Sequence, residues 1–422
     1  MQLQKILKNN ITNYLVYLAT FILPFQFYFR IWRDKHITLF LVIIFLIFIF
    51  QIKKFVNKFY KDKILLLYLV FFLVFSLGFF RSENKIDAVK HIFFFFIAIP
   101  IYWVYKSTTN RNFVIKILLF SSTIFVVLII GMYFFKEYMF NLKIMKLFIE
   151  PNSLETILKG MPMYNVAEKY RSGGLFFNAN VAALNIGIYL GIIIYMFFVE
   201  RHKIFWLLIF FLFIFGLILT GSLSGLLSFY ISSTLIVFFF LIKNKKYIFL
   251  TIILLFLFIF FFSYKFICKV NPRYENLSKI KTFGGRMEIW AVSLEVIKDN
   301  WLFGVGLDTD SWNKYFNKFA KIKGYYVKNM PPHNMFLFIL GKSGIFCLLC
   351  FIIFILYTFI VNLKKFFYSR DIFYLCIINM IIWLMLIGMT ENLLLMDVRI
   401  SSIFWLLLGV SQVCEIKTIS KN

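Results

Sequence analysis

Charged residues are scarce in this sequence. They make up 15% of the 422 residues, and only 19 residues are acidic, whereas about a quarter of the residues in a soluble domain are charged. Hydrophobic residues account for 62% of the chain and aromatic residues for 22%. A soluble fold cannot hide so much apolar surface from water. The composition therefore excludes soluble, disordered and collagen-like chains and predicts an all-α polytopic membrane protein.

Cysteine is scarce as well. The five cysteines are odd in number and three of them lie in apolar runs, which excludes a disulfide-framework fold. Cys347 and Cys350 form a C-x-x-C pair, but residues 345–355 around them contain no His and no carboxylate. We expect these thiols to pack as small apolar side chains. The outer loops show no acidic cluster typical of a Mg²⁺ site, so neither a metal nor a cofactor is expected.

Basic residues greatly outnumber acidic ones. The 46 Lys and Arg give a net charge of +27, which in a soluble protein would indicate nucleic-acid binding. In a membrane protein, Lys and Arg gather in cytoplasmic loops and face anionic lipid. We therefore expect membrane lipid, and no nucleic acid, as a partner.

Charge clusters divide the apolar sequence into candidate membrane spans. A spanning helix needs about 20 apolar residues, or somewhat fewer where the bilayer thins. Twelve ranges satisfy this pattern: 12–29, 37–52, 64–80, 92–105, 113–135, 181–200, 204–220, 225–242, 247–264, 343–362, 372–388 and 400–413.

The distribution of Lys and Arg sets the expected orientation. With the N-terminus inside, the cytoplasmic segments hold most of the basic residues of the short loops, as the positive-inside rule requires. Both termini are then cytoplasmic. The chain divides into 1–264 with nine spans and an outer loop at 136–180, a large outer loop at 265–333, and 334–422 with three spans.

Two amphipathic helices are predicted in the large outer loop. The segment 286–299 has an apolar stripe at helical spacing, formed by Met287, Trp290, Ala291, Leu294 and Ile297. A second apolar stripe begins at Trp312, and Gly324 follows it as a stop signal. Such helices lie on the bilayer or pack over the mouth of the bundle, either to shield helix ends or to grip a substrate.

Arg286 opens the first of these helices, directly after Gly284 and Gly285. Free N–H groups and the helix dipole favour an anion at a helix N-terminus, and a guanidinium group can bind phosphate oxygens bidentately. Arg286 is therefore a candidate phosphate ligand, with a lipid-headgroup anchor as the alternative.

His333 follows Pro331 and Pro332 at the start of an apolar run. We expect it in the first turn of the next helix, at the outer membrane boundary. The positive end of the helix would keep the imidazole neutral, as a general base must be. A purely structural histidine is the alternative.

The other long loop ends in an Arg171-Ser-Gly-Gly turn before the sixth span. Paired glycines allow the backbone to approach a polar ligand closely, while Asn178 and Asn180 can cap the following helix. Arg399, just before the last span, either anchors the headgroup region or pairs with Asp397 or Glu391.

Several short motifs follow one another along residues 165–350. They are Arg171-Ser-Gly-Gly with Asn178-x-Asn180, Asn271-Pro-Arg273-Tyr274, Gly285-Arg286-x-x-x-Trp290, Asn300-x-x-Phe303-Gly-Val-Gly306, His333-Asn334 and Gly341-Lys-Ser-Gly-Ile345. In order, spacing and sidedness, this set resembles the O-antigen ligase and polymerase superfamily, whose members have a long periplasmic loop between late spans.

The resemblance implies a C-type glycosyltransferase-like fold acting at the periplasmic face of a bacterial inner membrane. An O-antigen ligase moves a glycan from undecaprenyl pyrophosphate to a sugar hydroxyl of lipid A-core, without a metal and with inversion at the anomeric carbon. By analogy, His333 would assist removal of the acceptor proton, and Arg286 and Arg171 would hold the pyrophosphate. The weaker substrate-binding candidates are Arg273, Asn334 and Arg399.

One position departs from the family pattern. Many relatives have an Arg in the turn that corresponds to residues 220–225, where this chain has Leu223. Either another Arg substitutes for it or the donor is held differently.

Other functions remain open. A polysaccharide polymerase uses the same donor with a second lipid-linked glycan as acceptor, and a protein O-oligosaccharyltransferase modifies a protein. The compact size and the order of motifs in one loop favour a ligase. A transporter or flippase would need ionisable residues deep in its spans and matching broken helices in two halves. Lys116 and Lys342 are the main basic residues near apolar runs, and no such symmetry is visible.

Overall fold

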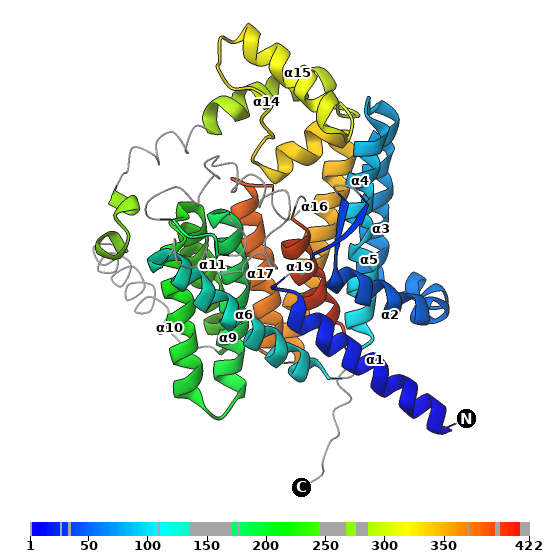
Figure 1. Ribbon diagram of the computed structural model, residues 1–422, viewed down its shortest axis with the longest axis vertical. Coiled ribbons are helices and arrows are strands. Elements are labelled where there is room, and N and C mark those ends of the chain that lie inside the picture. Colours follow the sequence, from blue (N-terminus) through cyan, green and yellow to red (C-terminus); the bar gives the residue numbers. More distant parts are fainter. Residues whose placement is uncertain are drawn as a thin grey trace.

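The computed structural model describes residues 2–25, 28–32, 35–108, 110–135, 171–174, 178–244, 267–275, 286–369, 371–392 and 397–413. These residues form a bundle of helices, with α14 and α15 across its upper end and the N-terminus at its lower end (Figure 1). The helices up to the first long gap are α1 (Gln2–Ile22), α2 (Leu39–Val56), α3 (Lys63–Ser76), α4 (Lys85–Phe96), α5 (Ala98–Lys106) and α6 (Arg111–Phe134). Those that follow are α9 (Ala179–Val199), α10 (Lys203–Leu219), α11 (Leu223–Asn244), α14 (Arg286–Asn300), α15 (Thr309–Ile322), α16 (Met335–Ser369), α17 (Phe373–Gly388) and α19 (Val398–Val410).

Short elements complete the described part. The 3-10 turns are η1 (Phe59–Lys61), η2 (Leu77–Arg81) and η5 (Pro272–Glu275). Strands β1 (Tyr28–Trp32) and β2 (Lys35–Thr38) form an antiparallel hairpin between α1 and α2, with Tyr28 opposite Thr38. Apart from this hairpin the described chain is helical, as expected.

Six helical segments are long and apolar enough to cross a membrane, which confirms a polytopic membrane protein. They are Leu39–Val56, Lys63–Arg81, Lys85–Lys106, Arg111–Phe134, Ala179–Val199 and Met335–Ser369. Shorter apolar helices are Ile11–Ile22, Lys203–Leu219, Leu223–Leu235, Phe373–Gly388 and Val398–Val410. Every predicted span except 247–264 overlaps one of these helices. That range lies outside the described residues, so a total of twelve stays a prediction.

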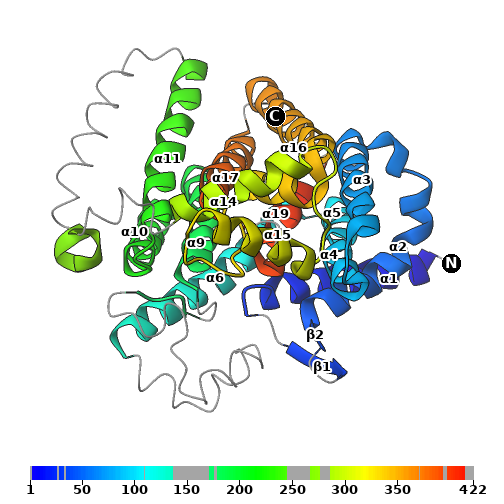
Figure 2. The ribbon, with the colours of Figure 1, turned by 90° about the horizontal axis from the view of Figure 1, so that it is seen from above.

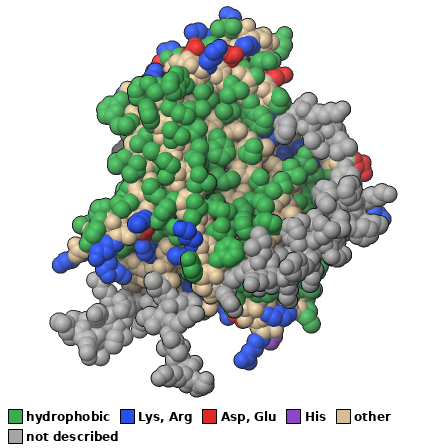
Figure 3. All heavy atoms as spheres, turned by 180° about the vertical axis from the view of Figure 1, so that it is seen from behind, with side chains coloured by type: hydrophobic (Ala, Val, Ile, Leu, Met, Phe, Trp, Pro, Cys, Tyr) green, Lys and Arg blue, Asp and Glu red, His purple; other side chains and the backbone are tan. Residues whose placement is uncertain are grey.

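The helices pack as two groups that meet along α16 and α17. On one side α3 packs on α16 and α5 on α19, and on the other α9 packs on α10 and α17. Figure 2, seen from above, shows α14 and α15 lying over the middle of the bundle. In Figure 3 a broad hydrophobic band covers the rear face between charged side chains at its upper and lower ends. Such a band is the surface that a bilayer contacts.

A break in α16 attaches this end of the bundle to α14. Gly344 lies at φ +83°, inside the helix, and the segment after α14 donates hydrogen bonds into the break, from Val305 N to Gly341 O at 2.8 Å. A Cβ at Gly304 would lie 2.3 Å from the carbonyl carbon of Lys342. The Gly-Val-Gly and Gly-Lys-Ser-Gly motifs are therefore two halves of one backbone contact.

Lys342 reinforces the same attachment. Its side chain is buried, and its Nζ donates to the carbonyl oxygens of Leu307 at 2.8 Å and Asp308 at 2.5 Å. Asp308 caps α15, because its Oδ2 accepts a hydrogen bond from Ser311 N. The same oxygen accepts a hydrogen bond from Asn84 N, just before α4. This network ties α14 and α15, which we call the cap (residues 286–322), to both α4 and α16.

The cap has a small hydrophobic core of its own. Ile289, Val292 and Val296 of α14 pack against Trp312 and Phe316 of α15. Both helices begin and end close to the predicted residues, and Gly324 follows α15 at φ +71°. The predicted apolar stripe of α14 was wrong in part, because Met287 and Leu294 are more than half exposed. Packing on α15 and α16 selects the neighbouring stripe instead.

Candidate functional site

Glu391, just beyond the end of α17, is the centre of a polar cluster. Its side chain is only 5% exposed. Oε1 accepts a hydrogen bond from Asn180 Nδ2 at 2.6 Å and another from Arg286 Nη2. Oε2 lies 3.1 Å from His333 Nδ1. One carboxylate therefore joins the two residues that the sequence indicated as catalytic.

The three partners of Glu391 come from the N-terminal ends of three helices. Asn180 lies in the first turn of α9, Arg286 is the first residue of α14, and His333 precedes α16 by two residues. Helix N-termini have a partial positive charge that favours an anion. Their convergence therefore stabilises the ionised carboxylate and creates a place for further negative charge.

The backbone holds His333 in an unusual conformation. Its φ is +46°, in the left-handed region that non-glycine residues seldom adopt. The following residue, Asn334, fixes this arrangement: its Oδ1 accepts from Phe336 N at 2.9 Å, and its Nδ2 donates to Met389 O at 2.9 Å. Because α16 begins at Met335, the expectation that His333 lies in its first turn was wrong. Asn334 takes the capping position instead.

The charge of Glu391 decides which ring nitrogen of a neutral His333 carries the proton. Burial raises the pKa of the Glu391 carboxyl, but the hydrogen bond with His333 and the charge of Arg286 outweigh burial, so this pKa is lowered from its usual value. An ionised carboxylate only accepts hydrogen bonds. In the neutral imidazole, Nδ1 must therefore hold the proton and donate to Glu391. The lone pair is left on Nε2.

Arg171 reaches the same cluster through Asn180. Arg171 Nη2 and Ser222 Oγ both donate to Asn180 Oδ1, at 2.9 Å each. Asn178 caps α9 as expected, because its Oδ1 accepts from Asn180 N at 2.9 Å. Residues from the turns before α9 and α11 are thus linked to Glu391.

Arg273 lies at the turn where the family pattern places an Arg. Arg273 Nε donates to the carbonyl oxygen of Gly221 at 3.1 Å, next to Leu223. Asn271 Nδ2 holds η5 to the same region by donating to Ile218 O at 3.0 Å. Burial raises the pKa of the Tyr274 hydroxyl, and the charges of Arg171 and Arg273 oppose this shift. Both guanidinium groups therefore lie near one phenol.

Two other predicted residues have different surroundings. Arg399 forms a two-point contact with Asp397, from Nε to Oδ1 at 3.0 Å and from Nη2 to Oδ2 at 2.6 Å. Asp397 is one of the two partners that the sequence suggested for Arg399. Asn334 uses its side chain to cap α16. The structure thus groups Arg171, Arg273, Arg286 and His333, while their roles stay predictions.

Glu391 was predicted only as a possible partner of Arg399 and not as a site residue. Its position could have marked it as functional, because acidic residues are rare in this chain and Glu391 follows directly after an apolar span. Asn180 was interpreted only as a helix cap, and nothing local marks Ser222 as its partner.

The fold and this cluster define a multi-pass membrane protein with a cationic polar site at one end of its helices. Residues 208–352 match the family model described as O-antigen ligase. The matched segment begins within α10, ends within α16 and includes Arg273, Arg286 and His333. This match supports the O-antigen ligase superfamily that the motifs indicated. A comparison with curated proteins finds no match.

Proposed function

We propose that this protein is a glycosyltransferase of the O-antigen ligase type. It would transfer a glycan from undecaprenyl pyrophosphate to a sugar hydroxyl of lipid A-core, at the periplasmic face of a bacterial inner membrane. In this orientation both termini are cytoplasmic. The main support is the contact of a single carboxylate, Glu391, with both His333 and Arg286.

His333 acts as the general base. Glu391 holds its Nδ1–H, so Nε2 takes the proton of the acceptor hydroxyl while that oxygen attacks the anomeric carbon. The bond from this carbon to the pyrophosphate oxygen breaks at the same time, and the bonding electrons leave with the phosphate. Attack from the opposite face inverts the anomeric centre. Glu391 stabilises the imidazolium that forms, as a carboxylate does in a catalytic triad.

The arginines stabilise the departing pyrophosphate. Pyrophosphate is already a good leaving group, so the enzyme mainly has to stabilise charge that develops on its oxygens. Arg286 pairs with Glu391, and Arg171 reaches the same carboxylate through Asn180. Arg273 donates to the carbonyl oxygen of Gly221. Guanidinium groups bind phosphate oxygens with fixed geometry. Arg273 supplies the positive charge at the turn that contains Leu223.

Arg399 and Asn334 are assigned lesser roles in substrate binding. Arg399 is held by Asp397, and the Asn334 side chain caps α16. Substitution of Arg399 should therefore reduce activity less than substitution of Arg286, while substitution of Asn334 should act through the position of His333.

Reconstitution tests the proposal. Purified protein in liposomes receives a lipid-linked glycan with either lipid A-core or a second lipid-linked glycan as acceptor. Attachment to lipid A-core identifies a ligase, and chain lengthening on the lipid-linked glycan identifies a polymerase. Transfer to neither acceptor would refute the assignment.

A paired substitution tests the base. His333→Ala should abolish transfer while the protein still inserts into the membrane. Tyr326→Ala, at a side chain that is 99% exposed on the loop after the cap, should leave transfer unchanged. Full activity of the His333→Ala variant would remove this residue from the mechanism.

A further inference from the structure

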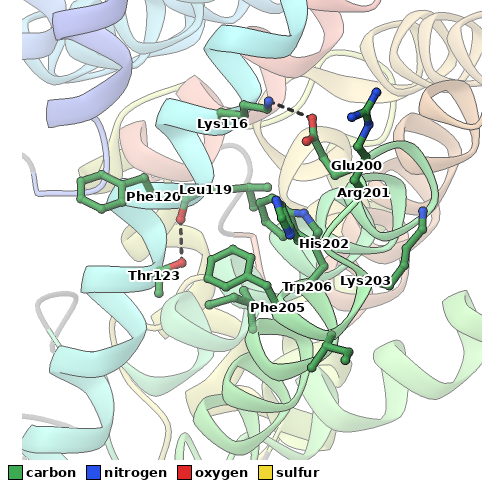
Figure 4. A pocket seen from close by; sticks show the side chains of 12 residues that line it. Lys116, Leu119, Phe120, Thr123, Glu200, Arg201, His202, Lys203, Phe205 and Trp206 are labelled. Atoms are coloured by element: carbon green, nitrogen blue, oxygen red, sulfur yellow. Dashed lines mark hydrogen bonds and ion pairs between the residues drawn. The ribbon is translucent and has the colours of Figure 1, made fainter.

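A hollow lies at the end of the bundle away from the cap. It encloses about 1090 Å³ between α6 and the start of α10, near the turn that joins α9 to α10. Figure 4 shows Leu119 and Thr123 of α6 on the side of Phe205 and Trp206 of α10, whereas the Phe120 ring points away from them. We call this hollow the basal groove, and it is lined by Lys116, Leu119, Phe120, Thr123, Glu200, Arg201, His202, Lys203, Ile204, Phe205, Trp206 and Ile209.

The rim of the basal groove is cationic. Lys116 Nζ pairs with Glu200 at 2.8 Å, so the only carboxylate in the lining is already neutralised. Lys203 Nζ donates to the carbonyl oxygens of Phe197 and Phe198 at the end of α9. Arg201 is exposed, and its side chain has no hydrogen bond or ion pair with any residue that the structure describes. The rim therefore has an excess of positive charge available to an anion.

The walls of the groove continue into the lipid-facing surface. Ile204 is 75% exposed, Phe205 53% and Leu208 63%. Such apolar exposure on a spanning helix faces hydrocarbon. Trp206 lies one turn inside α10, at the depth where aromatic residues line a membrane interface. A molecule that enters from the side must therefore be a lipid, with its polar end level with residues 200–203.

We propose that the basal groove binds an anionic glycerophospholipid from the leaflet at this end of the bundle. One acyl chain lies between Leu119 and Trp206, and the headgroup phosphate lies against Arg201. The complementary charge favours an anionic over a zwitterionic headgroup. Each basic residue at such a surface strengthens binding of anionic lipid by about fivefold. This site is separate from the Glu391 cluster, and the proposal does not depend on the glycosyltransferase function.

Native mass spectrometry of the purified protein tests this proposal. The protein in mild detergent is titrated with phosphatidylglycerol or with phosphatidylcholine of the same acyl chains. We expect one phosphatidylglycerol molecule to bind more tightly than phosphatidylcholine. Arg201→Gln should lower the affinity for phosphatidylglycerol about fivefold and leave phosphatidylcholine binding unchanged. Lys54→Gln removes an exposed charge in the last turn of α2 and is the matched control. It should leave the affinity for phosphatidylglycerol unchanged.

A second variant tests the groove itself. Thr123 lies on the wall of the groove. Thr123→Phe should place a ring in the path of the acyl chain and weaken the binding of both lipids without lowering thermal stability. The proposal predicts that the wild-type protein prefers the anionic lipid. Equal affinity for the two lipids would overturn it. Wild-type lipid affinity in Thr123→Phe, or equal losses in Arg201→Gln and Lys54→Gln, would overturn it as well. Cross-linking of another segment of this chain into the groove would have the same consequence.

Discussion

Replacement of Glu391 by Gln removes one charge from the centre of the site while it keeps the size of the side chain. The amide still accepts from Asn180 or Arg286 through its oxygen, but its NH₂ group cannot accept the Nδ1–H of His333. The imidazole then loses both its preferred tautomer and the carboxylate that stabilises it when protonated. We expect the loss mainly in kcat.

The geometry gives the size of this loss. Two unit charges at the 3.1 Å separation of His333 Nδ1 and Glu391 Oε2 interact by about 5 kcal/mol at an effective dielectric constant of about 20. The His333 side chain is 32% exposed, and its charge is only partly developed in the transition state, so about 2–4 kcal/mol is a reasonable share. At 1.36 kcal/mol for each factor of ten, kcat should fall by about 30- to 1000-fold.

The assay is transfer of glycan to lipid A-core in proteoliposomes under saturating donor. Glu295→Gln is the matched control, because it removes a carboxylate of α14 whose side chain is 32% exposed and which pairs with Lys323 away from the Glu391 cluster. It should retain the wild-type rate. A wild-type kcat in Glu391→Gln, or an equal loss of activity in both variants, would refute this role of Glu391.

Three further predictions concern Arg286, Glu391 and Lys342. Arg286→Lys should lower kcat/KM by about 10- to 100-fold in the same assay, because a point charge loses the forked geometry; an unchanged value would exclude bidentate phosphate binding. The lowered pKa of Glu391, below its usual 4.5, stabilises the fold fully above about pH 4.5 and less as the pH falls through that pKa. Thermal unfolding in detergent should thus show a larger loss of Tm between pH 5 and pH 3 in the wild type than in Glu391→Gln, and equal losses would contradict this. Lys342→Met should destabilise the protein by about 2 kcal/mol or more, because the carbonyl groups of Leu307 and Asp308 lose their donor; unfolding at the wild-type temperature would show that the carbonyl groups find other donors.

Local patterns were sufficient to predict much of the fold. A membrane span must be apolar and must satisfy its backbone hydrogen bonds internally, so each span leaves a continuous signal in the sequence. Similar local rules predicted the start of α14 at Arg286, the cap at Asn178 and the end of α15 near Gly324. In each case the physical cause lies within a few residues of the feature.

The buried face of α14 was not predictable in this way. Met287 and Leu294 form one apolar stripe, and Ile289, Val292 and Val296 form another at the same helical spacing. Periodicity identifies both stripes equally well. Contact with α15 and α16 decides between them, because only one stripe can face those helices.

The amino-acid sequence alone determined that this chain spans a membrane, which loops are rich in arginine, and which superfamily its motifs resemble, because these properties depend on composition and on short-range order. Only the tertiary structure decided that Glu391 joins His333, Arg286 and Asn180, residues 58, 105 and 211 positions away in the chain. Contacts across such separations depend on how α9, α14 and α16 pack together. No local pattern of residues encodes that packing.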